Sequence, residues 1–396
     1  MSELVERGDR SPRPRATLAT SSAAHLLHDG YSNLVYLFLP VWAEEFHLSL
    51  TQVGFLRAGY MGAMGFFQLP AGLFSERLGE RRLLGLGTAL MGLGFLAVGF
   101  AGGFIAILAL LVLAGFGSCV QHPLASSLVS RAYEAGGRRS ALGIYNFAGD
   151  VGKVALPGLV GLTLAAITWR QASAACGILA LLCALCIFLV LGRLGEGQRP
   201  ENEGTGTAEH ASRGWGIRDK AGFKTVSAIS VIDSSTRGAA LTFVPFLLLS
   251  KGASVQEVGL ALSLILGGGA FGKFICGMAA ERFGIVRTVI VTVVAKAAGI
   301  GILLAIPLGP TFVFLPLFGL ALNGTSSVLY GTVAELVEPE RHSRAFGLFY
   351  TLSTGSGAVA PAIYGVISDF ANVPVTLSIA AVIVLTTIPL ARLLRV

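Results

Sequence analysis

The chain has 396 residues, of which 54% are hydrophobic and only 13% are charged, and its mean hydropathy is +0.74. This composition excludes an ordinary soluble domain and is typical of a protein that crosses a membrane many times. The formal net charge of +7 does not indicate nucleic-acid binding, because the basic residues fall in short loops between apolar runs. All five cysteines lie in apolar runs, which predicts free thiols: Cys119, Cys176, Cys183, Cys186 and Cys276.

Twelve apolar segments are each long enough to cross a bilayer, which takes about 20 helical residues. We therefore predict an all-α membrane protein with twelve transmembrane helices, at approximately 17–42, 51–74, 82–101, 104–130, 140–166, 171–192, 223–249, 257–280, 288–307, 311–336, 344–368 and 373–393.

Basic residues alternate between the two sides of these spans. The N-terminal tail, the loops after spans two, four, eight and ten, the segment between spans six and seven, and the C-terminus hold 22 of the 29 lysines and arginines. The remaining loops hold only Arg170 and Lys251. Because positive charge is retained on the cytoplasmic side of a membrane, both termini are expected in the cytoplasm. Residues 1–16 carry no signal-peptide pattern and are interpreted as a disordered cytoplasmic tail.

Span one carries a polar stripe on one helical face, at about 100° per residue. A carboxylate near the middle of a bilayer costs on the order of 2.5–3.5 kcal/mol unless it faces protein or water, so the stripe is expected to face an internal cavity. Imidazoles change charge near neutral pH. We predict that Asp29, His25 and His28 carry protons and that Asn33 and Tyr36 contact substrate. The alternative is a polar contact that only helps helices to pack.

Spans four and five add further candidates for the same cavity. Gln121 and His122 precede Pro123, which removes a helical hydrogen bond and favours a kink. A buried histidine satisfied by a neighbour is the alternative for His122. On span five, Asp150 and Lys153 are spaced i, i+3 and can form a pair, with Asn146 one turn earlier. We count Asp150 among the proton carriers, and Asn146 and Lys153 among the substrate contacts with Gln121 and His122.

The second half of the chain offers mainly polar substrate contacts. Asp233 and Arg237 on span seven are spaced i, i+4 and are expected to pair. Each charge pair either neutralises itself or gives its cation to a substrate anion. Asn323, Tyr330 and Tyr350 are the further predicted contacts.

Three more charged residues fall within predicted spans. Arg57 either extends to the outer membrane surface or pairs with an acid across the cavity. Lys273 is expected to extend to the cytoplasmic end of span eight, and Lys296 on span nine to have a structural role.

The sequence repeats with an offset of about half its length. Gly72, Glu76, Arg77 and Gly79 after span two recur 205 residues later as Gly277, Glu281, Arg282 and Gly284. Arg139 and Arg344 share this offset, and Asp29 and Asp233 are 204 apart. Two parallel six-helix repeats are typical of one large transporter architecture. The repeats would occupy residues 17–192 and 223–396, joined by a cytoplasmic linker over 193–222.

The doubled motif and the twelve spans resemble the major facilitator superfamily over nearly the whole chain, with Glu76 and Glu281 where that family usually has aspartate. Within it, His25, His28 and Asp29, the Gly115-to-Pro123 stretch with His122, and the Gly149 and Gly152 region resemble the fosmidomycin-resistance efflux group. Asp150 and Lys153 depart from the neutral residues of that group. The resemblance implies proton-driven export of small, often anionic compounds. It also implies that the motif residues form gates, in which Glu76 can meet Arg139 or a helix N-terminus.

No phosphate-binding loop, zinc site or nucleophile triad appears, so we expect a protein that is not an enzyme and needs no cofactor or metal. The favoured function is a monomeric, proton-coupled exporter of small anionic or amphipathic drugs or metabolites, by alternating access. A proton-coupled symporter that imports an organic anion is the first alternative. A membrane ligand sensor without transport activity is the second. Its partners would be the bilayer, the small-molecule substrate and protons.

Overall fold

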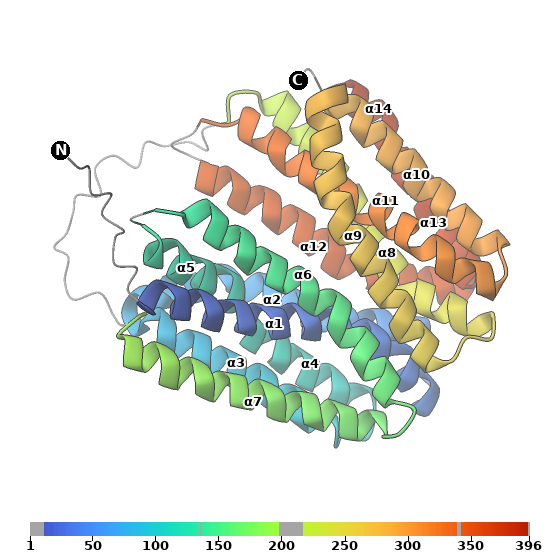
Figure 1. The fold of residues 1–396 in the computed structure, drawn as a ribbon. Coiled ribbons are helices and arrows are strands. Elements are labelled where there is room, and N and C mark those ends of the chain that lie inside the picture. Colours follow the sequence, from blue (N-terminus) through green and yellow to red (C-terminus); the bar gives the residue numbers. More distant parts are fainter. Residues whose placement is uncertain (1–11, 135, 198–216, 339–341, 395–396) are drawn as a thin grey trace, which may run out of the picture.

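Figure 1 shows a computed structural model of the chain, which describes residues 12–134, 136–197, 217–338 and 342–394. Twelve long helical segments run through these ranges, in agreement with the prediction. They are α1 (Pro12–Glu45), α2 (Leu50–Leu78), α3 (Glu80–Val98), α4 (Phe104–Ser118) continued by η1 (Gln121–Ala125) and α5 (Ser126–Ala132), α6 (Arg138–Thr163), α7 (Trp169–Leu194), α8 (Lys220–Ser250), α9 (Val255–Phe283), α10 (Ile285–Ala305), α11 (Leu308–Glu335), α12 (His342–Phe370), and α13 (Val373–Leu385) continued by α14 (Thr387–Arg392).

Seven of these segments, within the described ranges, are apolar and long enough to cross a membrane by composition alone. The five that fail this test are α1, α2, α6, α8 and α12. These five helices carry most of the polar and charged residues that the sequence assigns to the cavity. Such residues lower the apolar character of a helix, which is tolerated where they face protein or water rather than lipid.

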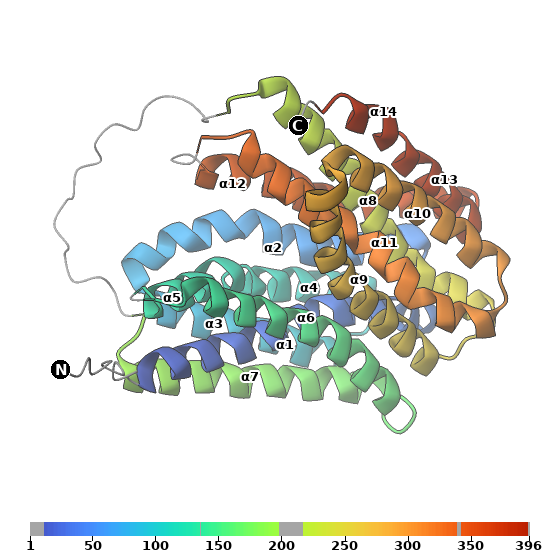
Figure 2. The ribbon, with the colours of Figure 1, turned by 45° about the horizontal axis from the view of Figure 1, so that its top comes forward.

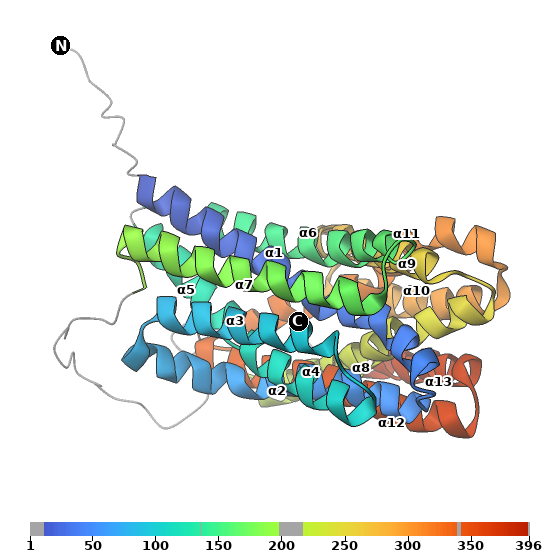
Figure 3. The ribbon, with the colours of Figure 1, turned by 90° about the horizontal axis from the view of Figure 1, so that it is seen from below.

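The helices form two bundles, α1 to α7 and α8 to α14, which are drawn in blue to green and in yellow to red in Figures 1 and 2. Within the first bundle α1 packs on α6 and α3 on α7, and within the second α9 packs on α11 and α8 on α12. Across the two bundles α2 packs against α12 and α6 against α9, which Figure 3 shows from below. The two-repeat architecture is therefore confirmed.

A glycine brings α1 and α6 into backbone contact. A Cβ added at Gly152 would lie 2.7 Å from the carbonyl carbon of Leu26, closer than real side chains approach. Small residues allow membrane helices to pack this closely. The close approach places Asp29 of α1 beside Lys153 of α6.

The two motif glycines have the same conformation. Gly79 ends α2 with φ 80° and ψ 146°, and Gly284 ends α9 with φ 87° and ψ 154°. Side chains other than glycine rarely adopt this φ. The repeat seen in the sequence is thus a repeated turn, and each turn leads directly into the next helix.

Two predicted boundaries need correction. Helix α1 begins at Pro12, inside the predicted tail of residues 1–16, because proline is well suited to the first turn of a helix. Helix α7 ends at Leu194 and α8 begins at Lys220, so both enter the predicted linker of 193–222. Residues 1–11 and 198–216, which make up most of the tail and linker, lie outside the described residues.

The bundles are joined by polar contacts at the end of the molecule where α2 begins and α12 ends. Asp369 of α12 accepts hydrogen bonds from the backbone N–H groups of Leu50 and Thr51 at the start of α2, at 2.7 and 2.9 Å. In the second contact between the bundles, that of α9 with α6, the hydroxyl of Ser263 donates to the carbonyl oxygen of Val154 at 2.6 Å. This end is therefore closed by polar contacts between the bundles.

Candidate functional site

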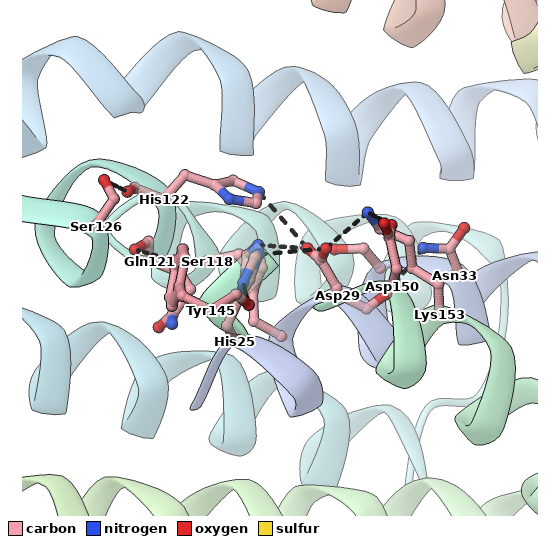
Figure 4. A network of polar contacts seen from close by, with 12 residues as sticks. His25, Asp29, Asn33, Ser118, Gln121, His122, Ser126, Tyr145, Asp150 and Lys153 are labelled. Carbon is pink, nitrogen blue, oxygen red and sulfur yellow. Dashed lines mark hydrogen bonds and ion pairs between the residues drawn. The ribbon is translucent and has the colours of Figure 1, made fainter. Parts of the chain in front are cut away.

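Asp29 lies at the centre of a buried polar cluster (Figure 4). Its Oδ2 is 3.3 Å from Nε2 of His25, and its Oδ1 is 3.8 Å from Nε2 of His28. From α6, the ammonium of Lys153 lies 2.8 Å from Oδ2. His122 contributes a third imidazole, with Nε2 3.6 Å from Oδ1. The structure thus gathers the span-one, span-four and span-five candidates around one carboxylate.

The ring of His25 is held in place by Tyr145. Nδ1 of His25 lies 2.9 Å from the backbone carbonyl oxygen of Tyr145, and the two rings stack with centroids 4.1 Å apart. Since a carbonyl oxygen only accepts, Nδ1 carries a hydrogen. The other ring nitrogen, Nε2, is thereby directed at Asp29.

His122 reaches the cluster from an irregular turn. Residues Gln121–Ala125 form a π-helical segment between α4 and α5, and Pro123 lies inside it. The helix is therefore interrupted where the sequence predicts a kink, as is common at functional sites. The His122 side chain is 41% exposed, whereas that of Asp29 is 5% exposed. Gln121, by contrast, is buried with no hydrogen-bond partner for its Nε2 among the described residues.

An alternating chain of charges leads from Asp29 to the other bundle. Lys153 is 3.0 Å from Asp150, as predicted, but it also contacts Asp29, which the sequence analysis missed. Lys273 of α9 lies 2.9 Å from the same Oδ1 of Asp150. The expectation that Lys273 extends to the end of span eight is wrong. Helix α9 packs against α6, and this packing places Lys273 beside the Asp150 carboxylate of α6.

The predicted pair of Asp233 and Arg237 does not form. Asp233 pairs instead with Lys296 of α10, whose side chain is 0% exposed. A buried ammonium without a partner is strongly unfavourable, so Lys296 takes the only carboxylate within ion-pair distance among the described residues. Arg237 donates to the hydroxyl of Ser234 at 3.2 Å and has no ion pair among the described residues.

Arg57 follows neither predicted alternative. It is 4% exposed, donates to the carbonyl oxygen of Ser32 at 2.7 Å, and places its guanidinium 3.9 Å from the ring centroid of Tyr36. A cation over an aromatic face is stabilised without a carboxylate. Tyr36 is therefore a buried partner of Arg57 rather than an exposed substrate contact in this conformation.

The other predicted substrate contacts differ in exposure. Asn33 and Asn323 are nearly buried and donate to carbonyl oxygens of their own helices, at 2.8 and 3.4 Å. Asn146 is exposed. Tyr350 is 49% exposed and stacks on Tyr330 with ring centroids 4.8 Å apart. Asn146 and this tyrosine pair are accessible to a ligand.

The predicted gate can be described only in part. The side chains of Glu76, Arg139 and Arg344 lie outside the described residues. Arg77, Glu281 and Arg282 are exposed, and a Cβ added at Gly72 or Gly277 would meet nothing within 4 Å. The sequence analysis missed the ion pair between buried Glu80 at the start of α3 and Arg131 of α5. It also missed Asp369, which joins the bundles at the other end.

Charged side chains between the bundles differ in exposure. Lys273, His122 and Lys153 are 39%, 41% and 30% exposed although they lie well within their helices. Arg57 and Tyr36, nearer the end held by Asp369, are buried. The accessible part of the polar cluster therefore lies away from the end held by Asp369.

Both bundles match one family model separately. The model described as Major Facilitator Superfamily matches residues 22–229 and again residues 226–396. The chain belongs to the major facilitator superfamily. The resemblance seen in the sequence is thereby confirmed, and with it the expectation of a transporter rather than an enzyme.

Relatives of this superfamily member cover most of its length. It is 26% identical over 371 residues to the fosmidomycin resistance protein of Escherichia coli K12, which spans 92% of this chain and 89% of that protein. It is 23% identical over 350 residues to the hexuronate transporter of Bacillus subtilis 168, spanning 83% and 82%. A crystal structure of a bacterial homologue of the human lysosomal transporter Spinster, inward-facing and occupied, superimposes with a TM-score of 0.81 at 16% identity, covering 97% of each chain.

The chain is therefore a multi-pass membrane protein and a secondary transporter that binds a small-molecule substrate. The polar cluster around Asp29 lies between the helices that carry its charged residues.

Proposed function

We propose that this superfamily member is a proton-driven exporter of small anionic or amphipathic drugs or metabolites. It would act as a monomer in a bacterial inner membrane, with both termini in the cytoplasm and with the two bundles rocking about the cavity. The observation that carries the proposal is the position of Lys153, whose ammonium lies 2.8 Å from Asp29 and 3.0 Å from Asp150 while its side chain is 30% exposed.

The charge of the cavity favours an anion. The charge of Asp233 is neutralised by its buried partner Lys296 and is left out of the count. Two ionised carboxylates, Asp29 and Asp150, then face three cations, Lys153, Lys273 and Arg237. With neutral imidazoles the net charge is positive, and Arg237 is the cation without an ion pair among the described residues. A carboxylate-bearing substrate would neutralise this remaining positive charge.

Lys153 links the anion to the proton because it contacts two carboxylates at once. While Asp29 is ionised, Lys153 is held between Asp29 and Asp150, where an anion can reach it. Exchange requires that the proton and the anion compete for this group, so that the anion displaces Asp150 from Lys153 only while Asp29 carries no proton. Proton uptake and anion binding then alternate.

Relatives that confer resistance support the direction of transport. Besides the fosmidomycin resistance protein, the chain is 26% identical to the tetracenomycin C resistance and export protein of Streptomyces glaucescens over 158 residues, or 40% of this chain. We propose export on this basis, with His25 and His28 assisting Asp29 as proton carriers.

Symport of an organic anion with protons is the second candidate. It is favoured by the hexuronate transporter among the relatives and by the charge of the cavity. If the anion binds at Arg237 rather than at Lys153, a proton on Asp29 makes the cavity more positive and strengthens anion binding. Proton and anion would then move together.

Reconstitution into proteoliposomes with an imposed pH gradient tests the proposal. Glucuronate and fosmidomycin serve as probes, and glucose is the neutral counterpart of glucuronate. Export by exchange predicts that a probe moves against its gradient in the direction opposite to protons. Movement of the probe with the protons would support symport instead. Binding without movement of any probe would favour a ligand sensor.

The variant Lys153→Ala tests whether this lysine contacts the anion. Loss of a charge-assisted contact is expected to weaken binding of an anionic probe by about 1–3 kcal/mol and to spare a neutral one. Lys224→Ala is the matched control, because Lys224 is exposed on the first turns of α8, away from the cluster. Equal losses of binding affinity for anionic and neutral probes, or no loss for either, would mean that Lys153 only neutralises Asp150 and does not contact the anion.

A further inference from the structure

Three imidazoles around Asp29 direct nitrogen atoms at its carboxylate. Nε2 of His25 and Nε2 of His28 are buried and have no hydrogen-bond partner among the described residues. Both atoms, and Nε2 of His122, are directed at the carboxylate of Asp29. Buried polar atoms are normally satisfied, so unpaired ones facing a common point suggest a ligand at that point.

The tautomer of His25 suits a metal ion. Because Nδ1 of His25 donates to the carbonyl oxygen of Tyr145, the neutral ring has a free lone pair on Nε2. Metal-binding histidines almost always donate their other ring N–H to a carbonyl or carboxylate group, which fixes the ring in this way. The stacking of His25 on Tyr145 holds the ring in the same orientation.

The spacing of the donor atoms also fits. One donor each from His25, Asp29 and His122 can be chosen so that all three lie within 4.8 Å of one another. The shortest separations to the carboxylate are 3.3 Å for His25 and 3.6 Å for His122. For zinc–nitrogen bonds of about 2.0–2.1 Å, neighbouring ligand atoms of a tetrahedron lie about 3.3 Å apart. Small side-chain adjustments therefore bring these three donors into range. His28 lies outside this group but is the nearest further imidazole, with its Nε2 3.8 Å from Oδ1 of Asp29.

We propose that His25, His122 and Asp29, with His28 as the fourth donor, form a binding site for a late first-row divalent cation such as Zn²⁺. Imidazole and carboxylate are the ligands that such ions accept, and three histidines with one carboxylate supply a full tetrahedral set. His122 is 41% exposed, which gives the ion a path of entry to the site.

Lys153 is the group that opposes the ion. Its ammonium contacts the Asp29 carboxylate at 2.8 Å, and a cation bound there must replace it. Lys153 can then pair with Asp150 alone, since their charged groups are already 3.0 Å apart. Because metal and proton would occupy the same lone pairs, a bound ion excludes the proton. The metal site itself does not depend on the direction or substrate of transport.

Titration of the purified, full-length protein with Co²⁺ tests the proposal. The protein is freed of any histidine tag and washed with chelator, and the visible absorption of tetrahedral Co²⁺ is recorded. Zn²⁺ is then added to displace Co²⁺. The expected result is one Co²⁺ per chain with an intense tetrahedral spectrum that Zn²⁺ removes.

Variants distinguish this site from adventitious binding. His122→Gln and Asp29→Asn are each expected to weaken binding at least about tenfold, the lower end of what even an outer-shell partner contributes. Lys153→Met is expected to strengthen binding, a gain that a surface site would not show. His122 is 41% exposed, so its replacement is compatible with folding. The controls are His47→Gln and the double variant Cys183→Ser/Cys186→Ser, which remove other possible ligands.

Several results would overturn the proposal. They are the absence of a tetrahedral Co²⁺ spectrum, an unchanged spectrum in His122→Gln and Asp29→Asn, or loss of the spectrum in either control. Proton-coupled transport is measured separately, in chelator-washed proteoliposomes that hold no metal. Failure of the metal site is therefore distinguishable from failure of the transport proposal.

Discussion

The buried pair of Lys296 and Asp233 gives a sharp prediction about stability. Lys296 on α10 is 0% exposed and the Asp233 side chain is 2% exposed, so water cannot solvate either charge after its partner is removed. Removing one partner of a buried pair costs about 3–5 kcal/mol, because an uncompensated charge remains. Lys296→Met is therefore expected to destabilise the second bundle by about that amount.

The double variant separates this effect from loss of packing. In Lys296→Met with Asp233→Asn no charge remains buried, so much of the stability is expected to return. The exposed pair of Arg138 and Glu134, with side chains 47% and 78% exposed and atoms 3.7 Å apart, is the control. Glu134→Gln is expected to cost less than about 1 kcal/mol.

Thermal unfolding in detergent, followed with a maleimide dye that fluoresces on reaction with cysteine, measures these changes. With the other four cysteines replaced by serine, Cys276, which is 4% exposed in the second bundle, reports the opening of that bundle. If Lys296→Met unfolded at the wild-type temperature, or if the double variant were less stable than the single one, the buried pair would not hold the bundle together as described.

Two further predictions concern the contacts between helices. Asp369→Ala removes two hydrogen bonds to the start of α2 and is expected to weaken the closed end by about 0.5–2 kcal/mol. A cysteine at position 32, introduced in a cysteine-free background, should then react faster with a membrane-impermeant maleimide added at the closed end, and an unchanged rate would contradict the assignment. Gly152→Leu would overlap the Leu26 carbonyl and is expected to lower stability by about 1–3 kcal/mol or more, whereas Gly143→Leu, at an open position, should not.

Much of the fold could be predicted because it depends on patterns along the chain. Apolar runs of about 20 residues marked the twelve helices, and the repeated motif marked the two bundles. The polar stripe of span one was predicted for the same reason, since Asp29 and both histidines share one helical face. The turns at Gly79 and Gly284 then proved to have the same conformation.

The partners of the charged residues could not be predicted, because they lie on other helices. Spacing along one helix suggested that Asp233 pairs with Arg237, but the packing of helices places Asp233 in an ion pair with Lys296 of α10. Similarly, the position of Lys273 near a helix end suggested a side chain that extends to the cytoplasmic end of span eight. The packing of α9 on α6 places it beside Asp150 instead. No spacing rule relates His122 to His25, so their meeting at Asp29 was visible only in three dimensions.

Asp29 is proposed to carry the proton that drives transport. The decisive measurement is proton movement in proteoliposomes when an anionic probe is added, for the wild type and for Asp29→Asn. An amide keeps the shape of the carboxylate but cannot take up the proton. Probe-dependent proton movement opposite to the probe is expected in the wild type, and none in Asp29→Asn, with both proteins equally inserted. Equal proton movement in the two proteins would contradict it.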